Sequence, residues 1–85
     1  MYNMQPAIIY LRSEIARSTS NYDRSILTTI MNYALVNATV DLECMVIGIQ
    51  NGEYSPELKV VAGWVQPLMV EPNLLVQLTL SEVLP

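Results

Sequence analysis

Residues 40–66 read VDLECMVIGIQNGEYSPELKVVAGWVQ, two apolar runs on either side of a polar segment. Whether these runs are strands or helices decides the architecture of the whole chain. In the first run, Val40, Leu42, Cys44 and Val46 alternate with Asp41, Glu43, Met45 and Ile47. A period of two is typical of a strand, here half exposed at its start and apolar on both faces further along. The spacing predicts a strand over residues 40–49.

The second run has the same period of two. Leu58, Val60, Ala62 and Trp64 form one face, against Lys59, Val61, Gly63 and Val65. Between the runs lies Asn51-Gly52, a dipeptide that favours hairpin turns because both residues tolerate positive φ. Pro56 cannot donate a hydrogen bond to a neighbouring strand, so we expect a wide loop over residues 50–57. The pattern predicts an antiparallel hairpin of residues 40–49 and 58–66.

A helix is the alternative for the second run. Ser55-Pro56-Glu57 has a serine at the cap, proline at the first position and an acid in the first turn, all typical of a helix start. The buried stripe of such a helix would consist of Leu58, Val61, Ala62 and Val65. Against it, three β-branched valines and Gly63 in the interior disfavour helix. The strand is the preferred interpretation, and the helix stays open.

The N-terminal half has helical spacing instead. The spacing of Ile8, Leu11 and Ile15 predicts a helix over residues 7–18, with Pro6 at its start. Ser20 and Asp23 then have the spacing of a capping box, which predicts a second helix over residues 21–36. Its apolar stripe is broad and contains Ile26, Leu27, Ile30, Met31, Tyr33, Ala34 and Leu35. We expect a sheet to cover one side of this helix, and the first helix or another subunit to cover the other.

At the C-terminal side, Pro67 and Pro72 bracket a connection with an apolar tip, and residues 74–80 alternate like a third strand. The predicted fold class is therefore α+β: two N-terminal helices packed on a small antiparallel sheet of about three strands, completed by oligomerisation. Residues 1–85 form one predicted domain, with a helical part (1–38) and a β part (39–85).

The composition predicts surface for a partner. The chain of 85 residues is 52% hydrophobic but only 14% charged, with a single lysine and no histidine. A domain of this size can hide only about 60–65% of the surface that its unfolded chain exposes. Some apolar side chains should therefore stay outside the core and contact other proteins.

The same inventory argues against an enzyme. Without histidine there is no default general base and no Ser-His or Cys-His pair. Cys44 is the only cysteine, and its apolar neighbours suggest a buried thiol. Asp41 and Glu43 would share one face of a strand, where a solvent-facing role is favoured over cation binding. No catalytic, cofactor-binding or metal-ligating residue is predicted, and no small-molecule substrate.

Charge and hydropathy exclude two other partners. Residues 1–38 carry three arginines against two acids, and residues 39–85 carry one lysine against six acids. So few basic side chains cannot supply phosphate contacts for nucleic acid. The longest charge-free run in the first half, residues 25–40, is too short and too polar for a membrane span. No basic residue precedes the first apolar residues, so we expect a cytoplasmic or virion protein without a signal peptide.

The leading functional hypothesis is a non-enzymatic structural or assembly subunit of a multi-subunit particle, such as a virus- or phage-like virion component. The alternative is a small acidic inhibitor or adaptor that binds one host protein through its acidic half. Tyrosine, tryptophan and exposed apolar side chains are typical of interfaces. The interface candidates are Tyr54, Trp64, Leu68, Met69, Val70, Met45, Ile47, Val61 and Tyr33.

Overall fold

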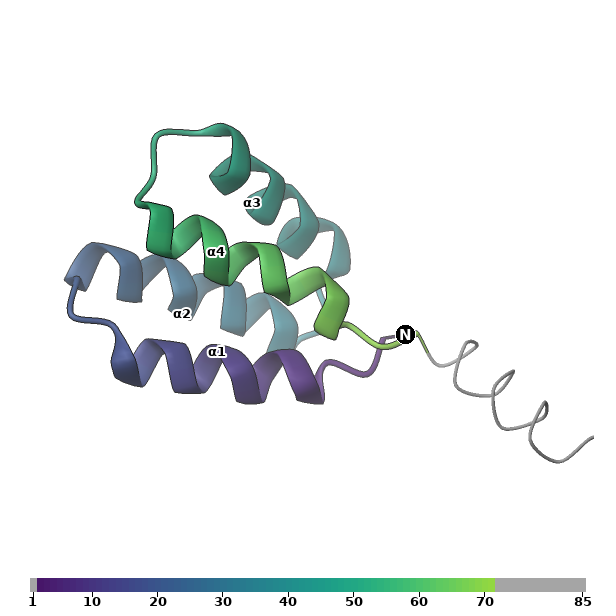
Figure 1. Cartoon of the computed structure of the whole chain (residues 1–85). Coiled ribbons are helices and arrows are strands. Elements are labelled where there is room, and N and C mark those ends of the chain that lie inside the picture. Colours follow the sequence, from purple (N-terminus) through teal and green to yellow (C-terminus); the bar gives the residue numbers. More distant parts are fainter. Residues whose placement is uncertain (1, 72–85) are drawn as a thin grey trace, which may run out of the picture.

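Four helices make up the fold of the computed structural model, which describes residues 2–71. They are α1 (Gln5–Arg17), α2 (Asn21–Leu35), α3 (Thr39–Asn51) and α4 (Pro56–Val65), followed by the 3₁₀ turn η1 (Gln66–Leu68). Consecutive helices run in opposite directions (Figure 1). Each helix packs on the next in the chain, and α4 packs back on α1, which closes an up-down-up-down bundle.

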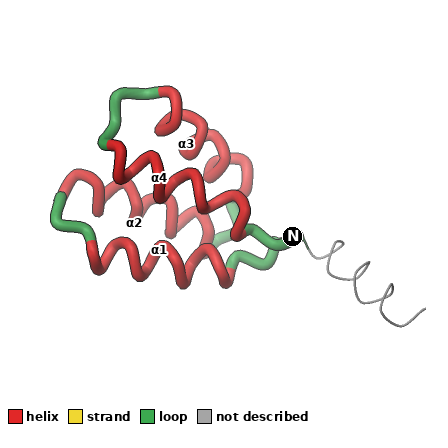
Figure 2. Tube along the Cα trace, viewed as in Figure 1, coloured by secondary structure: helices red, strands yellow, loops and turns green. Residues whose placement is uncertain are grey.

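The predicted α+β fold is wrong, because residues 2–71 contain no strand (Figure 2). The predicted strand over residues 40–49 lies in α3, and residues 58–65 lie in α4. Asn51 is the last residue of α3, and Gly52 follows with φ −101° and ψ −177°, so Asn51-Gly52 forms no hairpin turn. The third predicted strand, residues 74–80, lies outside the described residues.

The start of α4 matches the alternative that the sequence left open. The Ser55 hydroxyl accepts a hydrogen bond from the backbone N–H of Leu58 at 3.1 Å, and Pro56 occupies the first turn. The buried residues of α4 are Leu58, Val61, Ala62 and Val65, the stripe that the helical alternative predicts. Burial of this stripe outweighs the low helix propensity of valine and glycine, which amounts to about 1 kcal/mol or less per residue.

Helix α3 has no comparable start signal. Its N-cap is Ala38, whose side chain makes no capping hydrogen bond. Leu42, Val46 and Ile49 are buried at spacings of four and three, as a helix requires. The opposite side of α3 is also apolar. The sequence therefore lacks the clear contrast between an apolar and a polar side that indicates an amphipathic helix. This is the physical reason why the run resembles a strand.

The two N-terminal helices are confirmed. Pro6 lies in the first turn of α1, and Glu14 and Arg17 form an ion pair at 3.2 Å. Ser20 caps α2, since its hydroxyl accepts a hydrogen bond from the N–H of Asp23 at 3.2 Å. The Asp23 carboxylate accepts instead from the Ser55 hydroxyl at the start of α4, at 2.8 Å.

One apolar core runs through the bundle and draws on all four helices. Its largest fully buried side chains are Leu11, Ile30, Leu42, Ile49, Leu58 and Val65. Among the described residues no polar or charged residue is buried. Burial of apolar surface is therefore what holds the helices together, at roughly 25 cal/mol per Å² removed from water.

The two ends of the described chain meet at one end of the bundle. Asn3 and Val70 pair through two backbone hydrogen bonds of 2.8 and 3.1 Å, and the Tyr2 hydroxyl donates to Glu71 at 3.1 Å. Asn37, in the α2–α3 turn, donates from its side-chain amide to the Tyr2 carbonyl at 2.8 Å. Asn37 has φ 56°, a left-handed conformation that asparagine tolerates better than most residues. The start of α3 is thus tied to both ends of the described part of the chain.

Candidate functional site

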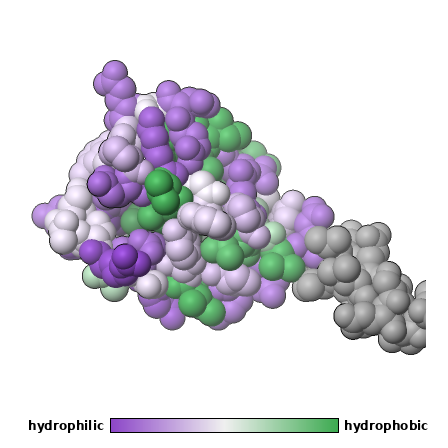
Figure 3. Space-filling view, in the orientation of Figure 1, coloured by the Kyte–Doolittle hydropathy of each residue, from purple (hydrophilic) through white to green (hydrophobic). Residues whose placement is uncertain are grey.

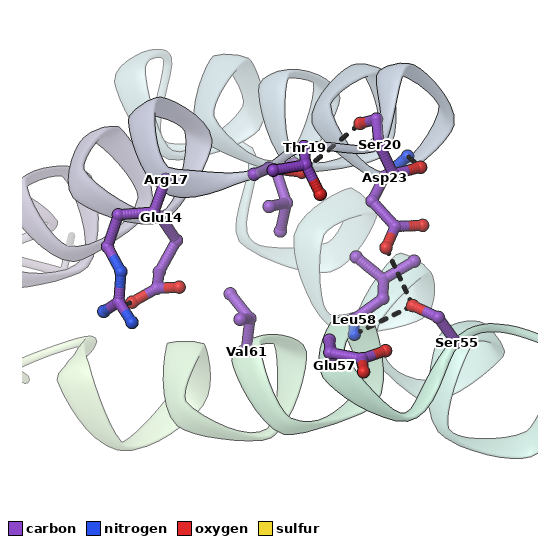
Figure 4. Close-up of a pocket in the computed structure, with 11 residues that line it drawn as sticks. Glu14, Arg17, Thr19, Ser20, Asp23, Ser55, Glu57, Leu58 and Val61 are labelled. Carbon is purple, nitrogen blue, oxygen red and sulfur yellow. Dashed lines mark hydrogen bonds and ion pairs between the residues drawn. The ribbon is translucent and has the colours of Figure 1, made fainter.

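A cavity of about 500 Å³ lies at the opposite end of the bundle, between the α1–α2 connection and the start of α4 (Figure 4). Its lining residues are Glu14, Arg17, Ser18, Thr19, Ser20, Asp23, Leu27, Ser55, Glu57, Leu58 and Val61. Leu58 and Val61 come from α4, and Glu14 and Arg17 from the last turns of α1. The cavity therefore combines apolar side chains with hydroxyl and carboxylate groups.

Three polar side chains of this cavity, those of Ser20, Asp23 and Ser55, make hydrogen bonds at the starts of helices. The Ser55 hydroxyl donates to Asp23 and accepts from the Leu58 N–H, while Ser20 caps α2 (Figure 4). Two helix caps are thereby joined by the hydrogen bond between Ser55 and Asp23. No histidine exists in the chain to activate Ser55 as a nucleophile. The Ser55 hydroxyl and the Asp23 carboxylate therefore have a structural role in this arrangement.

Tyr54 lies beside the same end of the bundle. Its ring stacks on that of Tyr22, with a centroid separation of 6.4 Å and an interplanar angle of 18°. Tyr22 is in the first turn of α2, and Tyr54 is in the connection between α3 and α4, so the pair joins two segments that are distant in sequence. Tyr54 is half-buried and packs against the core. Part of the surface that would make it an interface anchor is therefore used within the domain.

The predicted interface residues fall into three groups. Val61 and Met69 are buried in the core. Ile47 and Trp64 are exposed. The half-buried candidates are Tyr33, Met45, Tyr54, Leu68 and Val70. The apolar tip between Pro67 and Pro72 is thus not free, because Met69 inserts into the core and Val70 pairs with Asn3.

An apolar surface runs along the solvent side of α3. Val40, Cys44 and Ile47 follow one another at spacings of four and three, so they lie on one side of the helix, opposite the buried residues. We call these three residues the outer α3 face. Val40 is 72% exposed and Ile47 is 54% exposed, and the Cys44 thiol is exposed as well. Hydrophobic surface is visible along the edge of α3 in Figure 3.

The outer α3 face differs from what the sequence predicts. The expectation that Cys44 is buried is wrong. Sequence reasoning also missed Val40 as a surface residue, because a strand separates Val40 and Ile47 onto different faces. Asp41 and Glu43, which a strand would place on one face, lie on different sides of the helix, since residues two apart do not meet there. Testing the same run for a helical period would have brought Val40, Cys44 and Ile47 together.

The remaining exposed large hydrophobic residues lie elsewhere. Val60 and Trp64 share one side of α4, Ile9 is on α1, and Tyr22 is in the first turn of α2, where it stacks on Tyr54. Leu35 and Val36 lie at the end of α2, next to the turn that leads into α3. Helices α3 and α4 each offer two such residues on one side of the helix, and the outer α3 face adds the exposed thiol of Cys44 between Val40 and Ile47. The outer α3 face is therefore the candidate interaction site.

Two further features, a metal-binding group and a membrane-crossing helix, are absent from residues 2–71. No three side chains of cysteine, aspartate or glutamate gather there as a metal-binding group. None of the described helices combines the length and apolarity that a membrane crossing requires. No protein-family model, curated protein or solved structure matches this chain.

Proposed function

We propose that this protein is a non-enzymatic assembly subunit that acts by contact with further copies of itself. The observation that carries the proposal is the outer α3 face, on which Val40, Cys44 and Ile47 leave an uncharged stripe in water. Helices of monomeric proteins usually present polar residues on the side away from the core. Helix α3 instead has apolar side chains on two opposite sides, as a helix between two packed layers would.

The low charge of the chain fits this proposal. Interfaces between copies are depleted in charged residues at their centre and more apolar than the remaining surface. Here 14% of residues are charged, and the three residues of the outer α3 face are not, although Glu43 borders Val40 and Ile47 at spacings of three and four. Association through such a surface depends on apolar burial, which salt screens little. An adaptor that binds a basic partner through its acidic residues would lose affinity in high salt.

Light scattering coupled to size-exclusion chromatography tests the proposal. At micromolar concentration the wild-type chain should have a mass that is a multiple of 9.5 kDa, at both low and high salt. Ile47→Glu places a charge on the outer α3 face and should reduce the mass to that of a monomer. Ile9→Glu is the matched control, because Ile9 is 57% exposed but lies on α1, and it should leave the mass unchanged. A wild-type chain that stays monomeric contradicts the proposal.

A further inference from the structure

The outer α3 face is too small to hold two copies together by itself. Each of its three side chains can bury about 100 Å², if full burial of such a side chain is worth roughly 1.5–3 kcal/mol at about 25 cal/mol per Å². That makes about 300 Å², whereas a stable interface buries about 800 Å² per partner. Other apolar surface must contribute if this face holds an assembly together.

Residues 72–85 supply apolar side chains of the required kind. This segment, PNLLVQLTLSEVLP, contains one charged residue, Glu82. Its apolar side chains are Leu74, Leu75, Val76, Leu78, Leu80, Val83 and Leu84. Seven such side chains in one short segment offer more apolar area than the outer α3 face itself. Segment and face are therefore complementary in chemistry, since both are apolar and nearly free of charge.

The point from which this segment starts is held near the beginning of α3. Val70 pairs with Asn3, Glu71 accepts from Tyr2, and Asn37 just before α3 donates to the Tyr2 carbonyl. The hydrogen bond from Asn37 to the Tyr2 carbonyl, 2.8 Å long, therefore places the turn that leads into α3 beside this junction. The segment thus starts near the Val40 end of the outer α3 face.

The direction of the described chain favours the face of another copy. The described chain ends beyond one end of the bundle, outside the helices (Figure 1). Glu71 precedes Pro72, and a residue before proline disfavours helical and favours extended backbone, so we expect the chain to leave the bundle in an extended conformation at Glu71. We infer that residues 72–85 of one copy cover the outer α3 face of a second copy. This inference rests on the proposed function and names the partner surface.

A complementation experiment with full-length variants tests the exchange. The face variant Ile47→Glu keeps the segment, and the segment variant Val76→Asp/Leu78→Asp/Leu80→Asp keeps the face. Each variant alone should be monomeric, and an equimolar mixture should form a 1:1 complex, because the segment of the first then meets the face of the second. The mixture retains one of two exchanged contacts, so its affinity should be weaker than that of the wild type.

Matched controls separate the exchange from unspecific effects of charge. Gln77→Asp/Thr79→Asp/Ser81→Asp adds the same number of acids to the segment at polar positions and should still associate. Val40→Glu is a second face variant and should behave as Ile47→Glu does. The reaction of Cys44 with Ellman's reagent gives an independent readout. The thiol should react at least several-fold faster in the segment variant than in the wild-type assembly.

The outcomes distinguish this inference from the proposed function. A segment variant that still associates, while Ile47→Glu is monomeric, overturns the exchange but keeps assembly through the outer α3 face. A monomeric wild type whose Cys44 becomes more reactive in the segment variant shows the segment on its own α3, which overturns both proposals. A mixture that stays monomeric at concentrations at which the wild type associates overturns the exchange.

Discussion

Gly52 shows how a single residue shapes the connection between α3 and α4. Its backbone is extended, so it does not need the left-handed conformation that usually explains a glycine after a helix. What it needs is space. A Cβ atom on Gly52 would lie 2.7 Å from the Tyr54 ring and 2.9 Å from the Gly48 carbonyl oxygen. The absent side chain therefore lets Tyr54 fold over the end of α3.

We expect Gly52→Ala to destabilise the protein by about 1–3 kcal/mol, the usual cost of forcing an extra methyl group into a filled space. Gly48→Ala is the matched control. No atom lies within 4 Å of a Cβ at Gly48, which is exposed in the interior of α3. Alanine there should stabilise the protein by up to about 1 kcal/mol. Urea unfolding measures both, and equal stabilities of the two variants would contradict this account.

At the scale of elements, agreement between the helix start signal and the apolar period explains which helices could be predicted from the sequence. Helices α2 and α4 begin at Ser20 and Ser55, whose hydroxyl groups accept backbone hydrogen bonds in their first turns. Helix α2 also has a helical apolar stripe, so cap and period agree, and its prediction is confirmed. In α4 the cap competes with a period-two pattern of β-branched residues. Helix α3 has no side-chain cap, and the side opposite its buried residues is apolar. Its prediction as a strand is wrong.

Ser55→Ala tests the cap that joins α4 to α2. The substitution removes the acceptor for the Leu58 N–H and the donor to Asp23, so we expect a loss of about 1–2 kcal/mol in unfolding free energy. Ser13→Ala, at an exposed position of α1, should change stability by less than about 0.5 kcal/mol. Denaturant titration followed by far-ultraviolet circular dichroism measures both. A Ser55→Ala variant as stable as Ser13→Ala would show that the cap contributes nothing.

At the scale of the whole molecule, the junction of Tyr2, Asn37 and Glu71 closes the bundle. It connects the start of the described chain, the α2–α3 turn and the segment after η1. The hydrogen bond to Glu71 and the charge of that carboxylate raise the pKa of Tyr2 above its usual value of 10.0. A raised pKa in the folded state means that the protonated phenol stabilises the fold. This contribution is present below pH 10 and is lost as the pH rises through the folded-state pKa.

Alkaline titration of wild type and Tyr2→Phe measures this contribution. Absorbance at 295 nm should show that Tyr2→Phe lacks one tyrosine that ionises late, at a pH above 10. Tyr10, whose pKa is raised mainly by burial, should still ionise late in both proteins. The stability difference between the two proteins should shrink as the pH rises through this range. If Tyr2→Phe lacks an early-ionising tyrosine instead, the hydrogen bond to Glu71 is absent in solution.

The candidate site was predictable only in part for the same reason as the fold. Ile47 and Trp64 were named from the sequence and are exposed, whereas Val61 and Met69 were named and are core residues. Whether a residue is exposed or buried depends on the helical period, because the period decides which residues share a side of the helix. Once α3 is a helix, Val40 and Cys44 join Ile47. The apolar surplus itself follows from composition and does not depend on the fold.

The sequence by itself determined α1, α2, the cap at Ser20 and the surplus of apolar over charged side chains. Only the tertiary structure decided that residues 39–51 and 56–65 are helices. Local preferences there differ by less than about 1 kcal/mol per residue. Full burial of a large apolar side chain contributes about 1.5–3 kcal/mol. Because Leu42, Val46, Ile49 and the α4 stripe reach the common core only as helices packed on α1 and α2, burial prevails over the period-two pattern.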